Sequence, residues 1–322
     1  MKPAFSIIFF TVISGAGLGL LELIAFVDLF APGALPALLV WRGALLGLVL
    51  VAAGLASSVL HLAKPRNAWR SFSRFRTSWL SREAVFAAAL FVVAAIYITH
   101  VLGGATGRWR VSSAVGTLLL AWAVLLSTAM IYGSLKPIRQ WHTLWTPVNY
   151  LLLGHWSGAL LLAAMACAYL GARGPFLMLA GVLGVLALAA KLAYWFVTGD
   201  RGPGGAAAPT LERAIGVPAG VHGPGPVSVM HARLLDVGHS HGTFLTSEFG
   251  FELARRHARV LRVVALTLGF GLPLLWLASG VQRWPLGLLA ALCGIIGLLA
   301  ERWLFFAEAR HTVRLYHGDP RT

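Results

Sequence analysis

The stretch FSIIFFTVISGAGLGLLELIAFVDL, residues 5–29, decides the fold class. Apart from Glu22 and Asp28, every residue in it is apolar, small or uncharged. A helix needs about 20 such residues to cross the hydrocarbon core of a bilayer. The run is longer than the apolar region of a secretory signal peptide, which is about 7–15 residues. We therefore expect a retained transmembrane helix here rather than a cleaved leader.

Seven more segments have a similar length and composition. They are residues 38–60, 84–103, 111–133, 148–170, 175–198, 260–280 and 285–307. The chain is 58% hydrophobic and only 11% charged, whereas an ordinary soluble domain is about 25% charged. This composition excludes a soluble enzyme and a disordered chain. The sequence predicts an all-α protein, a single integral membrane domain over residues 1–322 with eight transmembrane helices.

Positive charge is distributed unevenly between the two predicted membrane faces. The net charge is +15, and 20 of the 26 Lys and Arg residues belong to one face. That face comprises the N-terminus and residues 61–83, 134–147, 199–262 and 300–322. Loops rich in Lys and Arg stay in the cytoplasm. We expect a multi-pass protein of the bacterial inner membrane with both termini and the 199–259 loop cytoplasmic, and no nucleic-acid partner.

His61 and Glu83 are the strongest candidates for chemistry, because ionisable residues at a membrane are costly. They end the second and begin the third predicted helix, at the same membrane face. A histidine can hydrogen-bond a quinone oxygen and accept its proton near neutral pH, and a carboxylate can pass that proton to water. Alternatively, His61 caps helix carbonyls, and Glu83 pairs with Arg82 or Arg74 or favours its helix N-terminus.

Three blocks of the sequence resemble the DmsC family, the membrane anchor subunits of DMSO-reductase-type molybdoenzymes. They are SSVLHLAKPRNAWRSFSRFRTSWLSRE at residues 57–83, LWTP at 144–147 and ERWLFF at 301–306. The resemblance covers nearly the whole chain, and is nearest to the anchors of quinone-linked sulfite dehydrogenases, the SoeC branch. Relatives tend to have Arg where this chain has Asn67, so the cation that contacts a quinone or a partner stays open.

The resemblance implies a function and a set of partners. The anchor would bind a quinone, ubiquinone or menaquinone, with His61 and Glu83 as catalytic and binding residues. It would exchange electrons between the quinone pool and a ferredoxin-like iron–sulfur subunit, which serves a molybdopterin catalytic subunit. Iron–sulfur clusters and molybdopterin would belong to those partners only. Sulfite oxidation and DMSO-type reduction both remain open, and so does the direction of electron flow.

Arg74, Trp79 and Ser81 lie inside the first matched block and are further candidates for lining the quinone head-group pocket. Alternatively, these residues only anchor the chain at the membrane interface, because Arg and Trp favour that depth. Glu22 either hydrogen-bonds a neighbouring helix or belongs to a proton path. Asp28 is expected near the surface and solvated.

Two other functions compete with a quinone-binding anchor. A cytochrome-b-type subunit would need haem ligands, for which His155 and His311 are the candidates. However, no histidine pairs recur within one helix, and DmsC-type anchors lack haem, so haem b is disfavoured. A secondary transporter would need midplane charge and an inverted repeat, and the sequence has no clear repeat. We expect no metal site, since His239 and His241 have no further ligands at standard spacing.

Overall fold

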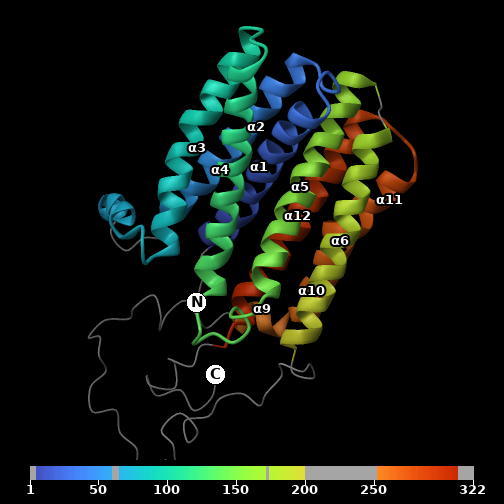
Figure 1. Ribbon diagram of the computed structural model, residues 1–322. Coiled ribbons are helices and arrows are strands. Elements are labelled where there is room, and N and C mark those ends of the chain that lie inside the picture. Colours follow the sequence, from blue (N-terminus) through green and yellow to red (C-terminus); the bar gives the residue numbers. More distant parts are fainter. Residues whose placement is uncertain (1–4, 60–64, 172–173, 200–251, 311–322) are drawn as a thin grey trace, which may run out of the picture.

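The computed structural model describes residues 5–59, 65–171, 174–199 and 252–310 (Figure 1). Within these residues every regular element is helical, and eight spans are long and apolar enough to cross a membrane. The predicted all-α membrane class is confirmed. The spans are Phe5–Phe30 (α1), Ala37–Val59 (α2), Trp79–Leu102 (α3), Arg108–Gly133 (α4), Trp145–Leu170 (α5), Gly174–Thr198 (α6), Ala258–Ala278 (α10, η3 and α11) and Trp284–Ala307 (α12).

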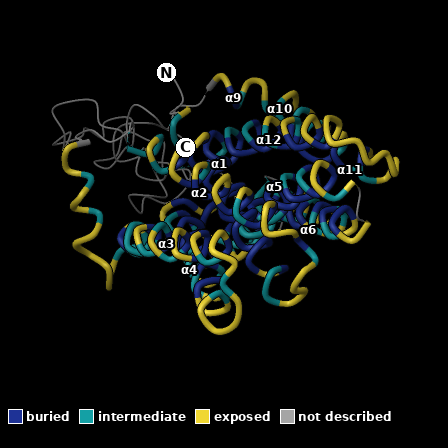
Figure 2. The backbone as a smooth tube through the Cα atoms, turned by 90° about the horizontal axis from the view of Figure 1, so that it is seen from above, coloured by how far each residue is buried: buried dark blue, intermediate teal, exposed yellow. Residues whose placement is uncertain are grey.

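Helix α1 is the centre of the bundle and packs against α2, α4, α5 and α12. In Figure 2 the buried residues gather inside and the exposed ones face outward. Glycines permit the close approach. A Cβ atom at Gly19 would lie 2.1 Å from the Gly154 carbonyl oxygen, and one at Gly17 would lie 2.5 Å from the Gly47 carbonyl oxygen. Small residues at helix contacts let membrane helices approach closely.

Successive helices alternate in direction, which gives the bundle two distinct ends (Figure 1). We call the end at which α1 begins the N-terminal face, and the other end the opposite face. The connections at the opposite face are short. The N-terminal face carries the longer connections, around residues 60–78, 134–144 and 199–257. Of the predicted 199–259 loop, only Gly199 and the residues from 252 onward lie within the described residues.

The seventh span is interrupted in its middle by a π-helical turn. It runs through α10 (Ala258–Leu266), η3 (Thr267–Gly271) and α11 (Leu272–Ala278). Pro273 has no N–H to donate back to the Gly269 carbonyl oxygen, as a regular helix would require. The indole Nε1 of Trp156 donates to that oxygen instead, at 3.0 Å. The irregular turn is thus fixed to α5.

Helix α3 begins earlier than the predicted residue 84. Ser78 caps it, since the Ser78 hydroxyl accepts a bond from the backbone N–H of Ser81 at 3.4 Å, as serine often does at helix starts. A short 3₁₀ helix, η1 (Pro65–Arg74), precedes this cap. Glu83 therefore lies one turn inside α3 instead of at its first residue.

Candidate functional site

Hydrogen bonds hold the η1–α3 corner at the N-terminal face. The backbone N–H of Arg74 donates to the Ser81 hydroxyl at 3.1 Å. The Arg82 guanidinium donates to the carbonyl oxygens of Phe75 at 3.1 Å and Arg76 at 2.8 Å. Ser81 is buried, so its hydroxyl serves to fix the direction of η1 against α3.

The other two residues proposed around the head-group pocket lie further out. Trp79 is half-buried, and the Arg82 guanidinium carbon lies 4.2 Å from its ring centroid. The Arg74 side chain is exposed. Among the four candidates of this block that the structure describes, Ser81 and Glu83 are buried, whereas Arg74 and Trp79 lie at the rim of the bundle.

Glu83 is the buried acid of this region, with 3% of its surface exposed. Its carboxylate accepts a hydrogen bond from the Thr128 hydroxyl on α4. Tyr132, four residues further along α4, shares the helix face of Thr128. The Tyr132 ring stacks on Tyr150, with centroids 5.6 Å apart and an interplanar angle of 17°. Glu83 therefore borders an aromatic cluster at the N-terminal face.

His61, the predicted partner of Glu83, lies outside the described residues. The last described residue of α2 before it, Val59, is at the N-terminal face, and α2 packs against α3. The ends of α2 and α3 that flank the predicted pair are thus on the same side of the bundle.

A second group of buried charges joins α6 to α12, and sequence reasoning missed it. The Lys191 ammonium donates to Glu301 Oε1, and Arg302 Nε lies 3.4 Å from Glu301 Oε2. The Arg302 guanidinium carbon lies 3.7 Å from the ring centroid of Tyr150. All three charged residues are buried. A lysine inside the apolar run of α6 is the signal that could have revealed this group.

Glu22 on α1 and His155 on α5 lie against each other inside the bundle. Glu22 Oε2 lies 2.6 Å from His155 Nε2, and His155 Nδ1 lies 2.8 Å from the Leu151 carbonyl oxygen. Contact with a neighbouring helix, one of the two expectations for Glu22, is therefore observed.

Both ring nitrogens of His155, a haem-ligand candidate, already have partners, and His311 lies outside the described residues. The metal-ligand candidates His239 and His241 also lie outside the described residues. Elsewhere, within residues 5–59, 65–171, 174–199 and 252–310, no group of three His, Cys, Asp or Glu residues could hold a metal.

The expectation that Asp28 is solvated is wrong. Its side chain is 6% exposed, and Arg110 Nη2 lies 2.6 Å from Oδ1 while Arg110 Nε donates to Oδ2 at 3.0 Å. The Tyr97 hydroxyl also donates to Oδ2, at 2.8 Å. Both partners are more than 60 residues away along the chain. A local sequence pattern therefore could not predict these contacts.

Comparison with known proteins supplies the family. The model of the DMSO reductase anchor subunit (DmsC) family matches residues 1–307. The protein is 34% identical to the C subunit of the sulfite dehydrogenase of Allochromatium vinosum, over 98% of its own length and 99% of that subunit. It is 28% identical to the C component of the anaerobic dimethyl sulfoxide reductase of Escherichia coli K12, over 44% of its own length and 49% of that component. The resemblance read from the sequence is confirmed, and the chain belongs to the DmsC family of membrane anchor subunits.

Proposed function

We propose that this anchor exchanges electrons between the membrane quinone pool, ubiquinone or menaquinone, and an iron–sulfur subunit of a heterotrimeric molybdoenzyme. The observation that carries the proposal is the setting of Glu83. It is a buried acid at the loop-bearing face, and in the described part of the chain its hydrogen bond comes from a neutral hydroxyl, not from a cation. An acid held this way can gain or lose a proton without breaking an ion pair.

Quinone chemistry needs such a group. Oxidation of a quinol releases two electrons and two protons, and reduction of a quinone consumes the same number. Glu83 would exchange one proton with a quinone oxygen, and His61 would exchange the other. The two electrons would pass to or from a cluster in the partner, because this family of anchors leaves metal chemistry to its partners. Trp79 and Arg74 at the rim would border the entrance to this site.

The partner would dock on the N-terminal face. The sequence assigns 20 of the 26 Lys and Arg residues to that face, and complementary charge would orient a ferredoxin-like subunit there. A molybdopterin subunit would complete the complex. The nearly full-length similarity to a sulfite dehydrogenase subunit favours sulfite oxidation over DMSO-type reduction. In that direction quinone would be the electron acceptor.

The basic N-terminal face would be cytoplasmic in a bacterial inner membrane. Reporter fusions after the C-terminus and within residues 200–251 test this orientation. We expect activity from a reporter that works only in the cytoplasm. Activity from a periplasmic reporter at either position would overturn the orientation and the docking face with it.

The site itself is tested in the purified complex. We expect His61→Ala and Glu83→Gln each to lower quinone-linked turnover by about 100-fold or more, the usual contribution of a positioned acid or base. Turnover of the catalytic subunits with an artificial dye should not change. Glu22→Gln is the matched control, because it removes another buried acid and should leave both rates intact. Wild-type quinone-linked rates in both site variants would refute the assignment.

A further inference from the structure

A small cavity of about 10 Å³ lies inside the bundle, where α1, α5 and α12 meet. Its polar lining residues are Thr11 of α1, Tyr150 and Ser157 of α5, and Arg302 of α12. Every residue that lines it is buried. A cavity needs about 10–15 Å³ to hold one water molecule. This cavity is therefore the size of a single water, and it is too small for a quinone ring or a lipid chain.

Two polar groups at this cavity lack a protein partner. Within the part of the chain that the structure describes, neither Arg302 Nη1 nor the Tyr150 hydroxyl has a hydrogen-bond partner, although both atoms are buried. Burying such a group unpaired is costly. Native proteins pair the great majority of their buried polar groups with protein or with ordered water. A molecule in the cavity would satisfy both groups.

Two further hydroxyls at the cavity can accept hydrogen bonds. The Thr11 hydroxyl donates to the Ile8 carbonyl oxygen at 3.1 Å, and the Ser157 hydroxyl donates to the Leu153 carbonyl oxygen at 2.9 Å. A hydroxyl has one hydrogen and two lone pairs, so both keep the capacity to accept. A water molecule, which accepts and donates, matches this set. An anion has no hydrogen for the two hydroxyls, and the Arg302 guanidinium repels a cation.

Gly15 of α1 keeps the space open. It lines the cavity, and a Cβ atom at this position would meet only the Gly154 Cα, at 3.8 Å, which is an ordinary van der Waals distance. Gly19, one turn further along the same helix, differs, because a Cβ atom there would lie 2.1 Å from the Gly154 carbonyl oxygen. Helix packing therefore requires a glycine at position 19 and leaves room for a methyl group at position 15.

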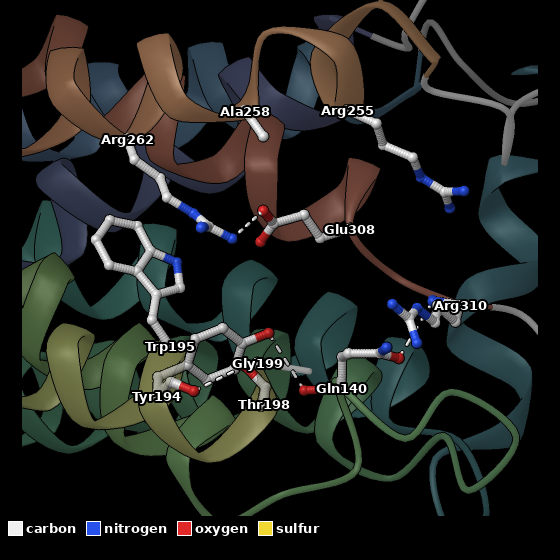
Figure 3. A pocket seen from close by; sticks show the side chains of 10 residues that line it. All are labelled: Gln140, Tyr194, Trp195, Thr198, Gly199, Arg255, Ala258, Arg262, Glu308 and Arg310. Carbon is white, nitrogen blue, oxygen red and sulfur yellow. Dashed lines mark hydrogen bonds and ion pairs between the residues drawn. The ribbon is translucent and has the colours of Figure 1, made fainter. Parts of the chain in front are cut away.

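The larger polar cavity at the N-terminal face is of another kind (Figure 3). Its volume is about 270 Å³, and it lies where α6 and α12 end and α10 begins. Arg262 Nη2 lies 2.6 Å from Glu308 Oε1, and the two side chains are 45% and 26% exposed. The Tyr194 hydroxyl donates to the Gln140 carbonyl oxygen at 3.2 Å. These groups have protein partners or reach solvent, so they do not require a bound molecule.

We propose that the inner cavity binds one water molecule. The water would accept a hydrogen bond from Arg302 Nη1, pair with the Tyr150 hydroxyl and donate to a hydroxyl of α1 or α5. Arg302 lies beside Glu301, which accepts a hydrogen bond from Lys191 on α6. The water would thus extend this buried polar group from α6 and α12 to α5 and α1. Its role is to hold these helices together, independently of the proposed quinone chemistry.

Density for the water is the direct test. A cryo-electron microscopy map of the whole complex, at a resolution that shows ordered waters, should contain a peak within hydrogen-bond distance of Arg302 Nη1 and the Tyr150 hydroxyl. The map of the Gly15→Ala complex should lack this peak, because the added methyl group takes its space. A wild-type map with no density in the cavity would overturn the proposal, and so would one in which a protein group pairs with Arg302 Nη1.

The sign of a stability change distinguishes a hydrated cavity from a dry one. Gly15→Ala expels the water and leaves Arg302 Nη1 unpaired, so the unfolding midpoint of the complex should fall by about 2–4 °C. In a dry cavity the same methyl group would fill a void, and alanine is the better helix former. The midpoint would then rise, which would overturn the proposal. Gly181→Ala on α6 is the matched control. A Cβ atom there meets no atom within 4 Å, and the midpoint should not fall.

Tyr150→Phe removes only the hydroxyl and gives a second measurement. With a bound water it should lower the midpoint, whereas in the Gly15→Ala background it should have little further effect, because the water is already lost. In a dry cavity, removal of an unpaired buried hydroxyl would raise the midpoint in both backgrounds, and this result would contradict the proposal. None of these measurements uses quinone-linked turnover, so this test can fail independently of the proposed function.

Discussion

Two regions at the N-terminal face each bury a carboxylate, and they compensate its charge in different ways. Between α6 and α12, Glu301 lies against the cations of Lys191 and Arg302. Between α3 and α4, Glu83 receives a hydrogen bond from the neutral Thr128 hydroxyl. The comparison separates an acid committed to holding helices together from an acid that can exchange a proton.

The other two buried acids resemble the α6–α12 region. Glu22 has His155 within 2.6 Å, and Asp28 has Arg110 within 2.6 Å. Within the residues that the structure describes, Glu83 differs from the other buried acids in having no histidine, lysine or arginine side chain within ion-pair distance. An uncompensated buried acid is costly, which makes a functional reason for Glu83 the stronger explanation.

Breaking the α6–α12 ion pair should have the largest effect on stability. Glu301→Gln leaves the Lys191 ammonium buried without its carboxylate partner, and we expect a loss of about 3–5 kcal/mol. Thermal unfolding of the purified complex in detergent measures it. The double variant Lys191→Met with Glu301→Gln removes both charges and should recover part of the loss. A single variant that unfolds at the wild-type temperature would contradict the structural role.

Asp28→Asn should have a smaller effect on stability. It keeps an acceptor for Arg110 and Tyr97 but removes the charge that assists their hydrogen bonds, and we expect a total loss of about 1–3 kcal/mol. The same unfolding assay measures this change. Quinone-linked turnover per folded complex should stay at the wild-type level, because Asp28 lies at the opposite face. A selective loss of quinone-linked turnover would indicate a quinone site at the opposite face and would contradict the proposed site at the N-terminal face.

Thr128→Val should affect turnover more than stability. The carboxylate of Glu83 would lose its hydroxyl donor, and we expect quinone-linked turnover to fall about tenfold, equivalent to roughly 1.4 kcal/mol. Thr128→Ser keeps a hydroxyl and should restore most of the rate. Steady-state kinetics with quinone and with dye check both variants. Equal rates for Val and Ser would mean that the hydroxyl does not position Glu83.

Arg74→Gln should have the smallest effect. The side chain is exposed, so the free energy of unfolding should change by less than about 0.5 kcal/mol. If Arg74 borders the entrance to the quinone site, KM for quinone rises a few-fold while kcat is unchanged. A wild-type KM would indicate that Arg74 only anchors the chain at the membrane interface. The role proposed for Glu83 would be unchanged by that result.

Hydropathy was sufficient to predict the fold class and the eight spans. It works because the bilayer requires a long apolar run for each crossing helix. The starts of helices were less accurate, since α3 begins at Trp79 through the local cap of Ser78. That difference of one turn moved Glu83 from the helix end into the interior.

Helix pairing could not be predicted from the chain. Lys191 and Glu301 are 110 residues apart, and Asp28 and Arg110 are 82 apart. No local pattern links such residues, because a hydropathy profile places each helix in the membrane without naming its neighbours. Glu83 was singled out as an ionisable residue at a predicted helix end, whereas Ser81, Trp79 and Arg74 came from the block that carries the family resemblance. The structure distinguishes the buried candidates, Glu83 and Ser81, from those at the rim.

The most direct test is a cryo-electron microscopy structure of the whole complex, purified with an excess of quinone. Our account predicts the quinone head group within hydrogen-bond distance of Glu83 and His61, beneath an iron–sulfur subunit seated on the N-terminal face. A head group bound elsewhere in the bundle, or a partner seated on the opposite face, would contradict it.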